Sequence, residues 1–273
     1  ILGKQIFWRD RMSLKAPNLK VFVVIIAYNA EKTIRNVIED IPREWVDRVV
    51  ISDDNSIDKT YDVSRAIPDV EVIKNKNNLH MGGNLKIVYN YAIKNDADII
   101  VSLHGDNQYD ASKIPDMIKP IISSEADVVI GSRLLGGMAL RGGMPKYKYM
   151  GNNLLNFIQN SAFKLKLSDY ASGYKAYSRK ALKTIPYLKN RNDFIFDEQF
   201  NTQAVFFGFK IEQVGIPTKY FKEASSVNFL TSVHYGLWTV ITTLQFLLAK
   251  KNFYIPMFLS KWALNSFSFF AIN

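Results

Sequence analysis

Two short polar clusters carry the residue types best suited to chemistry in this chain. The first contains Asp53, Asp54 and Asn55, and the second contains His104, Asp106, Asn107 and Gln108. Each cluster directly follows a run of apolar residues. Carboxylates that gather at one place repel one another unless a cation lies among them, and hard oxygen ligands suit Mg²⁺ or Mn²⁺. The two clusters therefore predict a site for a divalent cation that carries an anionic ligand such as a diphosphate.

Buried strands that alternate with helices are expected to position these clusters. Val21 to Ile26 is a continuous apolar run typical of a strand covered on both faces. Further strands are expected at 46–52, 70–73, 98–103, 127–130 and 210–216, and helices at 31–40, 57–66, 83–95, 112–123, 147–164, 179–184 and 197–208. This order predicts an α/β fold, a mostly parallel sheet with helices on both faces. Ligands of such sheets bind beyond the carboxyl ends of the strands, where both clusters fall.

Positive charge is concentrated in one region of the chain. The formal net charge is +10, and the segment from Arg133 to Arg191 contains twelve Lys or Arg against a single acid, Asp169. That segment alone carries +11, so the rest of the chain sums to −1. Such a region fits phosphates or an anionic membrane, and the simpler alternative is a solvated surface. Nucleic acid is not expected, because the interleaved aromatic residues are equally typical of a core or a membrane interface.

The composition excludes several classes of protein. The chain has 273 residues, of which 48% are hydrophobic, so it can bury a substantial core and is neither disordered nor collagen-like. It has no Cys and three His, which excludes disulfide frameworks, thiolate zinc sites and cysteine nucleophiles. No signal-peptide pattern follows Ile1, so the start is interpreted as trimmed and the cytoplasm is the default location.

The last fifth of the chain differs from the rest. Residues 229–249 contain no charged side chain, and threonines fall on one helical face while leucines and other aliphatic residues fall on the other. With Lys219, Lys222, Lys250 and Lys251 nearby, this pattern predicts an amphipathic helix that lies on an anionic membrane surface without spanning it. A packed core helix is the alternative. The expected organisation is a basic arm (1–20), an α/β domain (21–225) and a membrane-interface helical tail (226–273).

Five motifs together resemble a known family. They are Ala27-Tyr28-Asn29, Asp53-Asp54-Asn55-Ser56, Gly105-Asp106-Asn107-Gln108-Tyr109-Asp110, Gly131-Ser132-Arg133 and Ser172-Gly173-Tyr174-Lys175. Their order and their placement after successive strands resemble family 2 glycosyltransferases of the Rossmann-like GT-A fold, and most nearly the dolichol- and polyprenol-phosphate sugar synthases. The resemblance covers about residues 20–225. It implies an inverting, metal-dependent transfer of sugar from a nucleoside diphosphate sugar to a polyprenyl or dolichyl phosphate at the cytoplasmic face of a membrane.

The resemblance also implies which residues hold the donor. These would be Ala27, Tyr28, Asn29, Asp53, Asp54, Asn55, Gly82, Gly83, His104 and Gln108. For Asp53 and Asn55 the alternative is helix capping and turn formation, and for the two glycines it is a plain loop-to-helix turn.

The expected cation site departs from the family pattern. The family usually has an Asp-x-Asp pair here, and this chain has His104-Gly105-Asp106. Asp106 matches the second acid, so Mg²⁺ or Mn²⁺ would be held by Asp106, the donor diphosphate and either His104, Gln108 or water. The alternative for His104 is a hydrogen bond to a phosphate or a sugar hydroxyl.

Other residues are candidates for the acceptor side. The resemblance implies that Arg133, Arg141, Ser172 and Lys175 bind an acceptor phosphate, and that Asp106, Asp169, Asp197 and Glu198 are the catalytic acids. A lipid phosphate is already anionic, whereas a sugar hydroxyl needs a base such as Asp169, Asp197 or Glu198. Each of these three acids has the alternative of an ion pair with the basic segment. Two other functions stay open: transfer to a lipid-linked or glycan hydroxyl, and nucleotide-sugar binding without catalysis.

Overall fold

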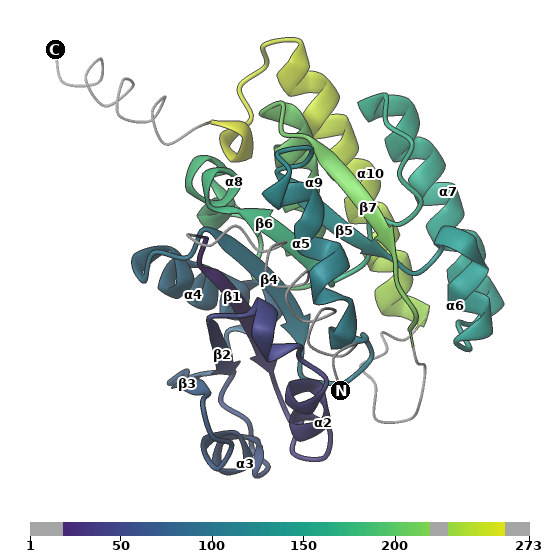
Figure 1. The fold of residues 1–273 in the computed structure, drawn as a ribbon. Helices are drawn as coiled ribbons and strands as arrows, with labels where there is room; N and C mark the ends of the chain where they lie inside the picture. Colours follow the sequence, from purple (N-terminus) through teal and green to yellow (C-terminus); the bar gives the residue numbers. More distant parts are fainter. Residues whose placement is uncertain (1–18, 219–228, 260–273) are drawn as a thin grey trace, which may run out of the picture.

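The structure is a computed structural model that describes residues 19–218 and 229–259. These residues form a seven-stranded sheet covered by helices on both faces (Figure 1). The strands are β1 (Val21–Ala27), β2 (Arg48–Asp53), β3 (Glu71–Lys74), β4 (Ile99–His104), β5 (Val128–Ser132), β6 (Lys175–Ser178) and β7 (Ile211–Gly215). The helices are α2 (Ile34–Glu39), α3 (Thr60–Arg65), α4 (His80–Lys94), α5 (Ile114–Ile122), α6 (Met138–Arg141), α7 (Lys146–Phe163), α8 (Arg179–Thr184), α9 (Phe196–Phe206) and α10 (Phe229–Lys250).

The sheet has the order β3-β2-β1-β4-β6-β5-β7. Every neighbouring pair is parallel except the two pairs made by β6, which runs antiparallel to both β4 and β5. The carboxyl ends of β1, β2, β4 and β5 therefore lie at one edge, and β6 begins at that same edge. The predicted fold class is confirmed, and the expected elements appear within a few residues of their predicted bounds.

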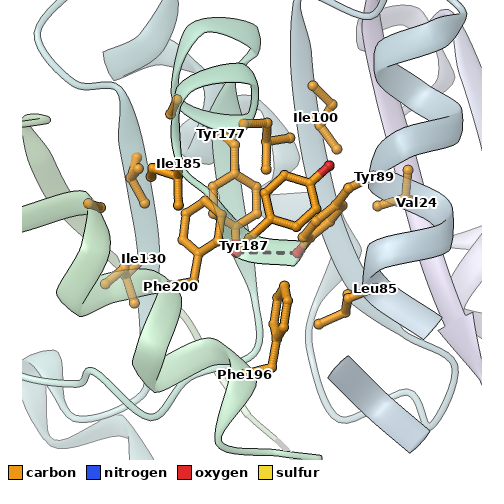
Figure 2. Packing of buried hydrophobic residues seen from close by; sticks show 14 of the residues in the cluster. Val24, Leu85, Tyr89, Ile100, Ile130, Tyr177, Ile185, Tyr187, Phe196 and Phe200 are labelled. Carbon is orange, nitrogen blue, oxygen red and sulfur yellow. Dashed lines mark hydrogen bonds between the residues drawn. The ribbon is translucent and has the colours of Figure 1, made fainter. Parts of the chain in front are cut away.

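The two faces of the sheet build two cores because successive strand residues point to opposite sides. Val21, Val23 and Ile25 of β1 pack with α2 and α5 on one face, while Phe22 and Val24 pack on the other. The second core is rich in aromatic rings. Figure 2 shows Tyr89 of α4, Tyr177 of β6 and Phe200 of α9 meeting above the sheet, where the Tyr89 and Tyr177 hydroxyls lie 3.3 Å apart.

Helix α10 packs onto the α/β unit and lies beside α7 and α9 (Figure 1). Phe246 of α10 contacts Phe163 of α7 with ring centroids 4.8 Å apart, and it belongs to the aromatic core with Phe258 just beyond the helix. No described helix combines the length and apolarity needed to cross a membrane. The predicted arm lies outside the described residues up to position 18, and so do Lys219, Lys222 and residues 260–273 of the predicted tail.

The glycine-rich segment after β5 is helical, whereas a mobile loop is the natural interpretation of its sequence. Gly136 and Gly137 have φ angles of 71° and 72°, a region that favours glycine, and they lead directly into α6. Ala139 of α6 is buried. Gly142 follows α6 and packs against the carbonyl of Thr218, since a Cβ added at Gly142 would lie 2.1 Å from that oxygen. The glycines thus permit close packing of this segment.

Candidate active site

The carboxyl edge of the sheet gathers most of the predicted site residues. Asp53 ends β2, Asp106 follows β4 by two residues, and Arg133 follows β5 by one. Lys175 is the first residue of β6, and its register partner on β4 is Ser102. The topology therefore brings the donor, cation and acceptor candidates to one edge, as the sequence predicts.

The donor candidates include residues that hold the loops of this edge. Asp54 is buried, and its Oδ1 accepts hydrogen bonds from Asn75 Nδ2 at 2.8 Å and from the Leu79 amide at 2.9 Å. Asp53 Oδ2 accepts from the Ser56 amide, and Oδ1 is buried with no hydrogen-bond partner among the described residues. This bond supports the turn-forming alternative for Asp53, and a donor contact by its buried Oδ1 stays a prediction.

Tyr28 and Asn29 differ in their freedom to contact a nucleotide. Asn29 has a φ of 53° and ties two loops together, since its Oδ1 accepts from the Ile57 amide at 3.1 Å. Asn55, at the next strand end, also has a positive φ of 60°. Tyr28 is 50% exposed, and buried Ala27 ends β1 beneath it. An exposed aromatic ring at a sheet edge suits stacking on a base, so Tyr28 is the better placed of the two for this contact.

Gly82 and Gly83 lie in the first turn of α4, where the chain packs closely on itself. A Cβ at Gly82 would lie 2.6 Å from the Arg191 carbonyl oxygen and 2.6 Å from Phe196 Cβ. Gly83 donates its amide to the Asn192 carbonyl at 3.1 Å. The close approach that requires glycine is thus to the segment before α9, and a nucleotide contact by these two residues stays a prediction.

The expected cation site offers one carboxylate of the right kind. Asp106 is buried, and its Oδ1 accepts from the Gln108 amide at 3.1 Å, which fixes the carboxylate and brings Gln108 beside it. Within the described residues no group of three His, Asp or Glu side chains forms a ready cage. A hard cation that takes its other ligands from a diphosphate and water fits this arrangement, and Asp106 would hold it.

His104 is packed rather than exposed to the loop region. A Cβ on Gly173 would lie 2.5 Å from the imidazole Cε1, and the Tyr109 ring lies edge-on with centroids 5.7 Å apart. Its Nε2 is buried and has no hydrogen-bond partner among the described residues. Tyr109 completes the contact, because its hydroxyl accepts from the Gly173 amide at 3.0 Å. The imidazole therefore joins the end of β4 to the turn that precedes Lys175.

Replacing His104 with Asp is expected to leave the fold intact and to tighten Mg²⁺ binding, because one more anionic hard oxygen joins Asp106. Isothermal titration of Mg²⁺ in the presence of a nucleoside diphosphate measures the change. His104→Asn, similar in size and uncharged, is the matched control and should not tighten binding. Equal Mg²⁺ affinity in wild type and His104→Asp would show that position 104 lies outside direct reach of the cation.

Arg133 and Asp169 form a bidentate buried pair. Arg133 Nε lies 2.8 Å from Asp169 Oδ2, and Nη2 lies 2.9 Å from Oδ1. The Arg133 amide also donates to Oδ2 at 3.0 Å. This geometry supports the alternative in which Asp169 is an ion-pair partner, and it fixes the guanidinium at the end of β5.

Lys148 of α7 is a second cation beside Arg133 that the sequence did not single out. Burial lowers the pKa of Lys148, and the positive charge of Arg133 lowers it further. Two cations brought into electrostatic contact favour an anion between or beside them. A cation early in a helix that passes over a strand end has no sequence signal of its own, so only the structure identifies it.

Lys175 is fully buried and pairs with Asp197. The Nζ atom lies 2.8 Å from Asp197 Oδ1, and the side chains are 0% and 9% exposed. Asp197 and Glu198 occupy the first turn of α9, where the helix dipole favours negative charge. The ion-pair alternative for Asp197 is therefore confirmed, and Lys175 is not exposed as a phosphate ligand would be.

Glu198 is the most perturbed acid of the described chain. Burial raises its pKa to about 7, while hydrogen bonds from Gln159 and Thr202 act in the opposite direction. Gln159 Nε2 lies 2.6 Å from Oε1, and Oε2 is buried with no hydrogen-bond partner among the described residues. A carboxyl group with a pKa near neutrality suits proton transfer, but the Glu198 side chain is fully buried, so a catalytic role for it stays a prediction.

The pKa of Glu198 predicts that its contribution to stability falls as pH rises. The folded pKa lies above the unfolded one, so the stabilising proton is fully present below about pH 4.5 and is lost as pH rises through about 7. Neutral Glu198→Gln should therefore gain about 2.5 kcal/mol of unfolding free energy relative to wild type between pH 5 and pH 8. Urea denaturation at both pH values measures it, with exposed Glu212→Gln as control. An unchanged difference between the two pH values would contradict the assignment.

Tyr235 of α10 also reaches this acidic group. Burial raises the pKa of its hydroxyl, and the charges of Glu198, Asp197 and Asp169 raise it further. On the same helix, the Trp238 ring receives the Arg191 guanidinium at 4.3 Å from its centroid. Helix α10 therefore forms a wall of the candidate site, which the sequence did not predict because its threonine face was assigned no partner.

Two other acceptor candidates lie at different depths. Ser172 is buried, and its Oγ accepts weakly from the Tyr174 amide at 3.4 Å. Arg141 ends α6 and is exposed. Of the four acceptor candidates, Arg141 is exposed and Arg133 keeps about a tenth of its side chain exposed beside Asp169, so phosphate contact by these two stays a prediction.

Comparison with known proteins decides the family. The family model described as glycosyl transferase family 2 matches residues 22–186, more than half of the chain. This chain belongs to glycosyltransferase family 2. The glycosyltransferase is 30% identical over 201 residues to an uncharacterized protein of Methanocaldococcus jannaschii, which covers 74% of this chain and 82% of the relative. It is 31% identical over 181 residues to a UDP-N-acetylglucosamine–dolichyl-phosphate N-acetylglucosaminyltransferase of Methanococcus voltae, which covers 60% and 72%.

Solved structures confirm the GT-A fold of the glycosyltransferase. Glucosyl-3-phosphoglycerate synthase from Mycobacterium tuberculosis, in complex with Mn²⁺, UDP and phosphoglyceric acid, matches with a TM-score of 0.66 at 18% identity. The match covers 86% of this chain and 80% of that one. The complex of that enzyme with Mg²⁺ and UDP gives a TM-score of 0.66 at 17% identity. The chain is thus an enzyme of the GT-A fold whose family takes sugars from nucleotide donors.

Proposed function

We propose that this glycosyltransferase transfers a sugar, with inversion at the anomeric carbon, from a nucleoside diphosphate sugar to the phosphate of a polyprenyl or dolichyl lipid. The observation that carries the proposal is the Arg133 guanidinium, which Asp169 fixes at the end of β5 on the same edge as Asp106, with Lys148 adding positive charge nearby. Two neighbouring cations beside the donor side of the sheet suit an anionic acceptor. The dolichyl-phosphate enzyme of Methanococcus voltae among the relatives supports the same acceptor class.

The transfer is a single displacement. An oxygen of the acceptor phosphate forms a bond to the anomeric carbon, while the bond from that carbon to the donor diphosphate breaks and the nucleoside diphosphate leaves. Opposite approach of the two oxygens inverts the carbon. A bound Mg²⁺ or Mn²⁺ would neutralise charge on the leaving diphosphate. Asp106 would hold that cation, Tyr28 and Asp53 would hold the nucleoside, and Arg133 with Lys148 would orient the acceptor phosphate.

The other candidate acids, Asp169, Asp197 and Glu198, take no part in the displacement in this proposal. A phosphate acceptor is already ionised near neutral pH, so no base is needed for the displacement. Asp169 fixes the direction of the Arg133 guanidinium, and Asp197 fixes Lys175. With a hydroxyl acceptor, in contrast, Glu198 would have to accept a proton, and activity would follow its ionisation.

Parallel assays with a radiolabelled donor test the proposal. Transfer to a polyprenyl phosphate, and none to the matching polyprenol or to a glycan, supports it. Lys148→Gln should raise KM for the lipid phosphate about tenfold while nucleotide binding is unchanged, because only the acceptor loses a cation. Lys183→Gln, which removes an exposed lysine of α8, is the control. Transfer to a hydroxyl acceptor alone, or donor binding without turnover, would overturn the proposal.

A further inference from the structure

Helices α7 and α10 present a continuous apolar surface to the outside, called here the α7/α10 face. It consists of Tyr147, Met150, Leu154 and Phe157 on α7 and Leu230, Val233, Leu237, Ile241, Leu244 and Leu248 on α10, all of them exposed. Met150 is 71% exposed and Leu230 is 77% exposed. On each helix these residues recur at intervals of three or four, so they form one stripe per helix. Contiguous apolar surface of this extent marks an interaction site.

Both helices turn their polar side inward. The buried residues of α7 include Asn156 and Gln159, and those of α10 include Thr239, Thr242 and Thr243. These side chains serve the site and the helix contacts: Gln159 binds Glu198, and Thr243 Oγ1 donates to the Thr239 carbonyl at 2.8 Å. The apolar stripes therefore contribute nothing to the core of the described chain. Their presence on the surface needs another explanation.

The two stripes lie next to each other. Gly236 of α10 faces Leu155 of α7, where an added Cβ would lie 3.8 Å from Leu155 Cδ1, and further along Phe163 meets Phe246. Both contacts advance in the same direction along the two helices, so α7 and α10 run parallel, and α10 extends past the end of α7 (Figure 1). The result is a two-helix platform about 27 Å long, the length of the 18 residues of α7.

Positive charge surrounds this platform at both ends. Lys146 begins α7, Lys164 and Lys166 follow it, Lys250 ends α10 and Lys251 follows that helix, all exposed. No Asp or Glu occurs between Leu134 and Ser168 or between Phe229 and Lys251. Exposed Phe253 and Tyr254 follow the last two lysines, where aromatic rings would meet a headgroup layer.

We propose that the α7/α10 face docks the enzyme onto an anionic lipid bilayer, with both helices lying in the plane of the interface. Apolar stripes would enter the headgroup boundary while the terminal lysines contact anionic headgroups. A second copy of the chain fits less well, because neither helix carries an acid to pair with the lysines of a facing partner. The same two helices wall the site through Gln159 and Tyr235, so docking would hold the acceptor side near the lipid. In this respect the inference rests on the proposed function.

Co-sedimentation of the full chain with vesicles tests the inference. Phosphatidylcholine vesicles containing phosphatidylglycerol should bind the protein, and pure phosphatidylcholine or high salt should weaken binding. Combining Leu154→Gln, Phe157→Gln, Leu237→Gln and Leu244→Gln should weaken binding at least about 100-fold, since four side chains lose apolar burial. Ile57→Gln with Leu188→Gln removes exposed apolar side chains elsewhere and should bind as wild type. Thermal melting verifies that both variants fold.

Three outcomes would overturn the inference: no binding of wild type to anionic vesicles, equal binding by the fourfold variant, or a dimer that the fourfold variant dissolves without any vesicle binding. Transfer to a short, water-soluble prenyl phosphate separates this inference from the proposed function. If that transfer persists without vesicle binding, only the docking face is wrong. If vesicles bind but no prenyl phosphate is glycosylated, the docking face stands and the proposed acceptor is wrong.

Discussion

Replacing Asp106 with Asn is expected to lower kcat by about 10³-fold or more and to abolish the effect of Mn²⁺ on nucleotide binding. Asp106 is the carboxylate that the described chain places beside Gln108 at the end of β4, and a neutral amide cannot balance a divalent cation. Steady-state transfer measures the first effect. Thermal shift with UDP, the nucleotide bound in the solved neighbours, measures the second with and without Mn²⁺.

A surface acid supplies the control for this experiment. Asp116 lies on α5 in exposed ion pairs with Lys113 and Lys119, so Asp116→Asn should preserve both transfer and the Mn²⁺ effect. Retained activity in Asp106→Asn together with an unchanged Mn²⁺ requirement would refute the assignment of Asp106 as the cation ligand.

Replacing Lys175 with Met is expected to destabilise the fold by about 3–5 kcal/mol, the largest stability effect predicted for this chain. Lys175 is 0% exposed and supplies the positive charge next to Asp197, with Glu198 one residue further on. Methionine fills similar space but leaves the Asp197 carboxylate buried without its cation. Urea denaturation at neutral pH measures the loss.

A double variant, Lys175→Met combined with Asp197→Asn, tests whether the lost ion pair causes this destabilisation. Removing both charges should restore most of the stability, because the cost arises from an unpaired charge rather than from lost packing. If the double variant is as unstable as Lys175→Met alone, the ion pair is not the reason why lysine occupies this position.

The sequence predicts the strand ends well because apolar runs and the polar residues after them are local signals. Asp53, Asp106 and Arg133 meet at one edge as a consequence of strand order alone. The antiparallel direction of β6 was not predictable, since a four-residue strand carries no mark of its direction. The contact between His104 and Gly173 depends on that direction, because it places the turn before Lys175 opposite the end of β4.

The faces of α7 and α10 show a second limit of prediction from sequence. Periodicity separates a polar from an apolar face, and the usual inference places the apolar face inward. Here Asn156 and Gln159 point inward because the Ser168 carbonyl and Glu198 supply partners, and the inward α10 threonines Thr239 and Thr243 bond to carbonyls of their own helix. Leu154 and Leu237 point outward. A pattern within one helix contains no information about those distant partners. The outward orientation of the apolar face of α10 was predicted, and exposed Leu237 and Leu244 agree with it, whereas the orientation of α7 was not predicted.

The late position of α10 in the chain also sets the order of assembly during synthesis. Phe246, Met257 and Phe258 complete the aromatic core that Phe163 and Phe206 begin. A nascent chain that has emerged only as far as β7 has all seven strands but still lacks these rings, so one side of its core is open to water. Native closure has to wait until residues near 258 leave the ribosome, and chaperones have a defined apolar surface to protect until then.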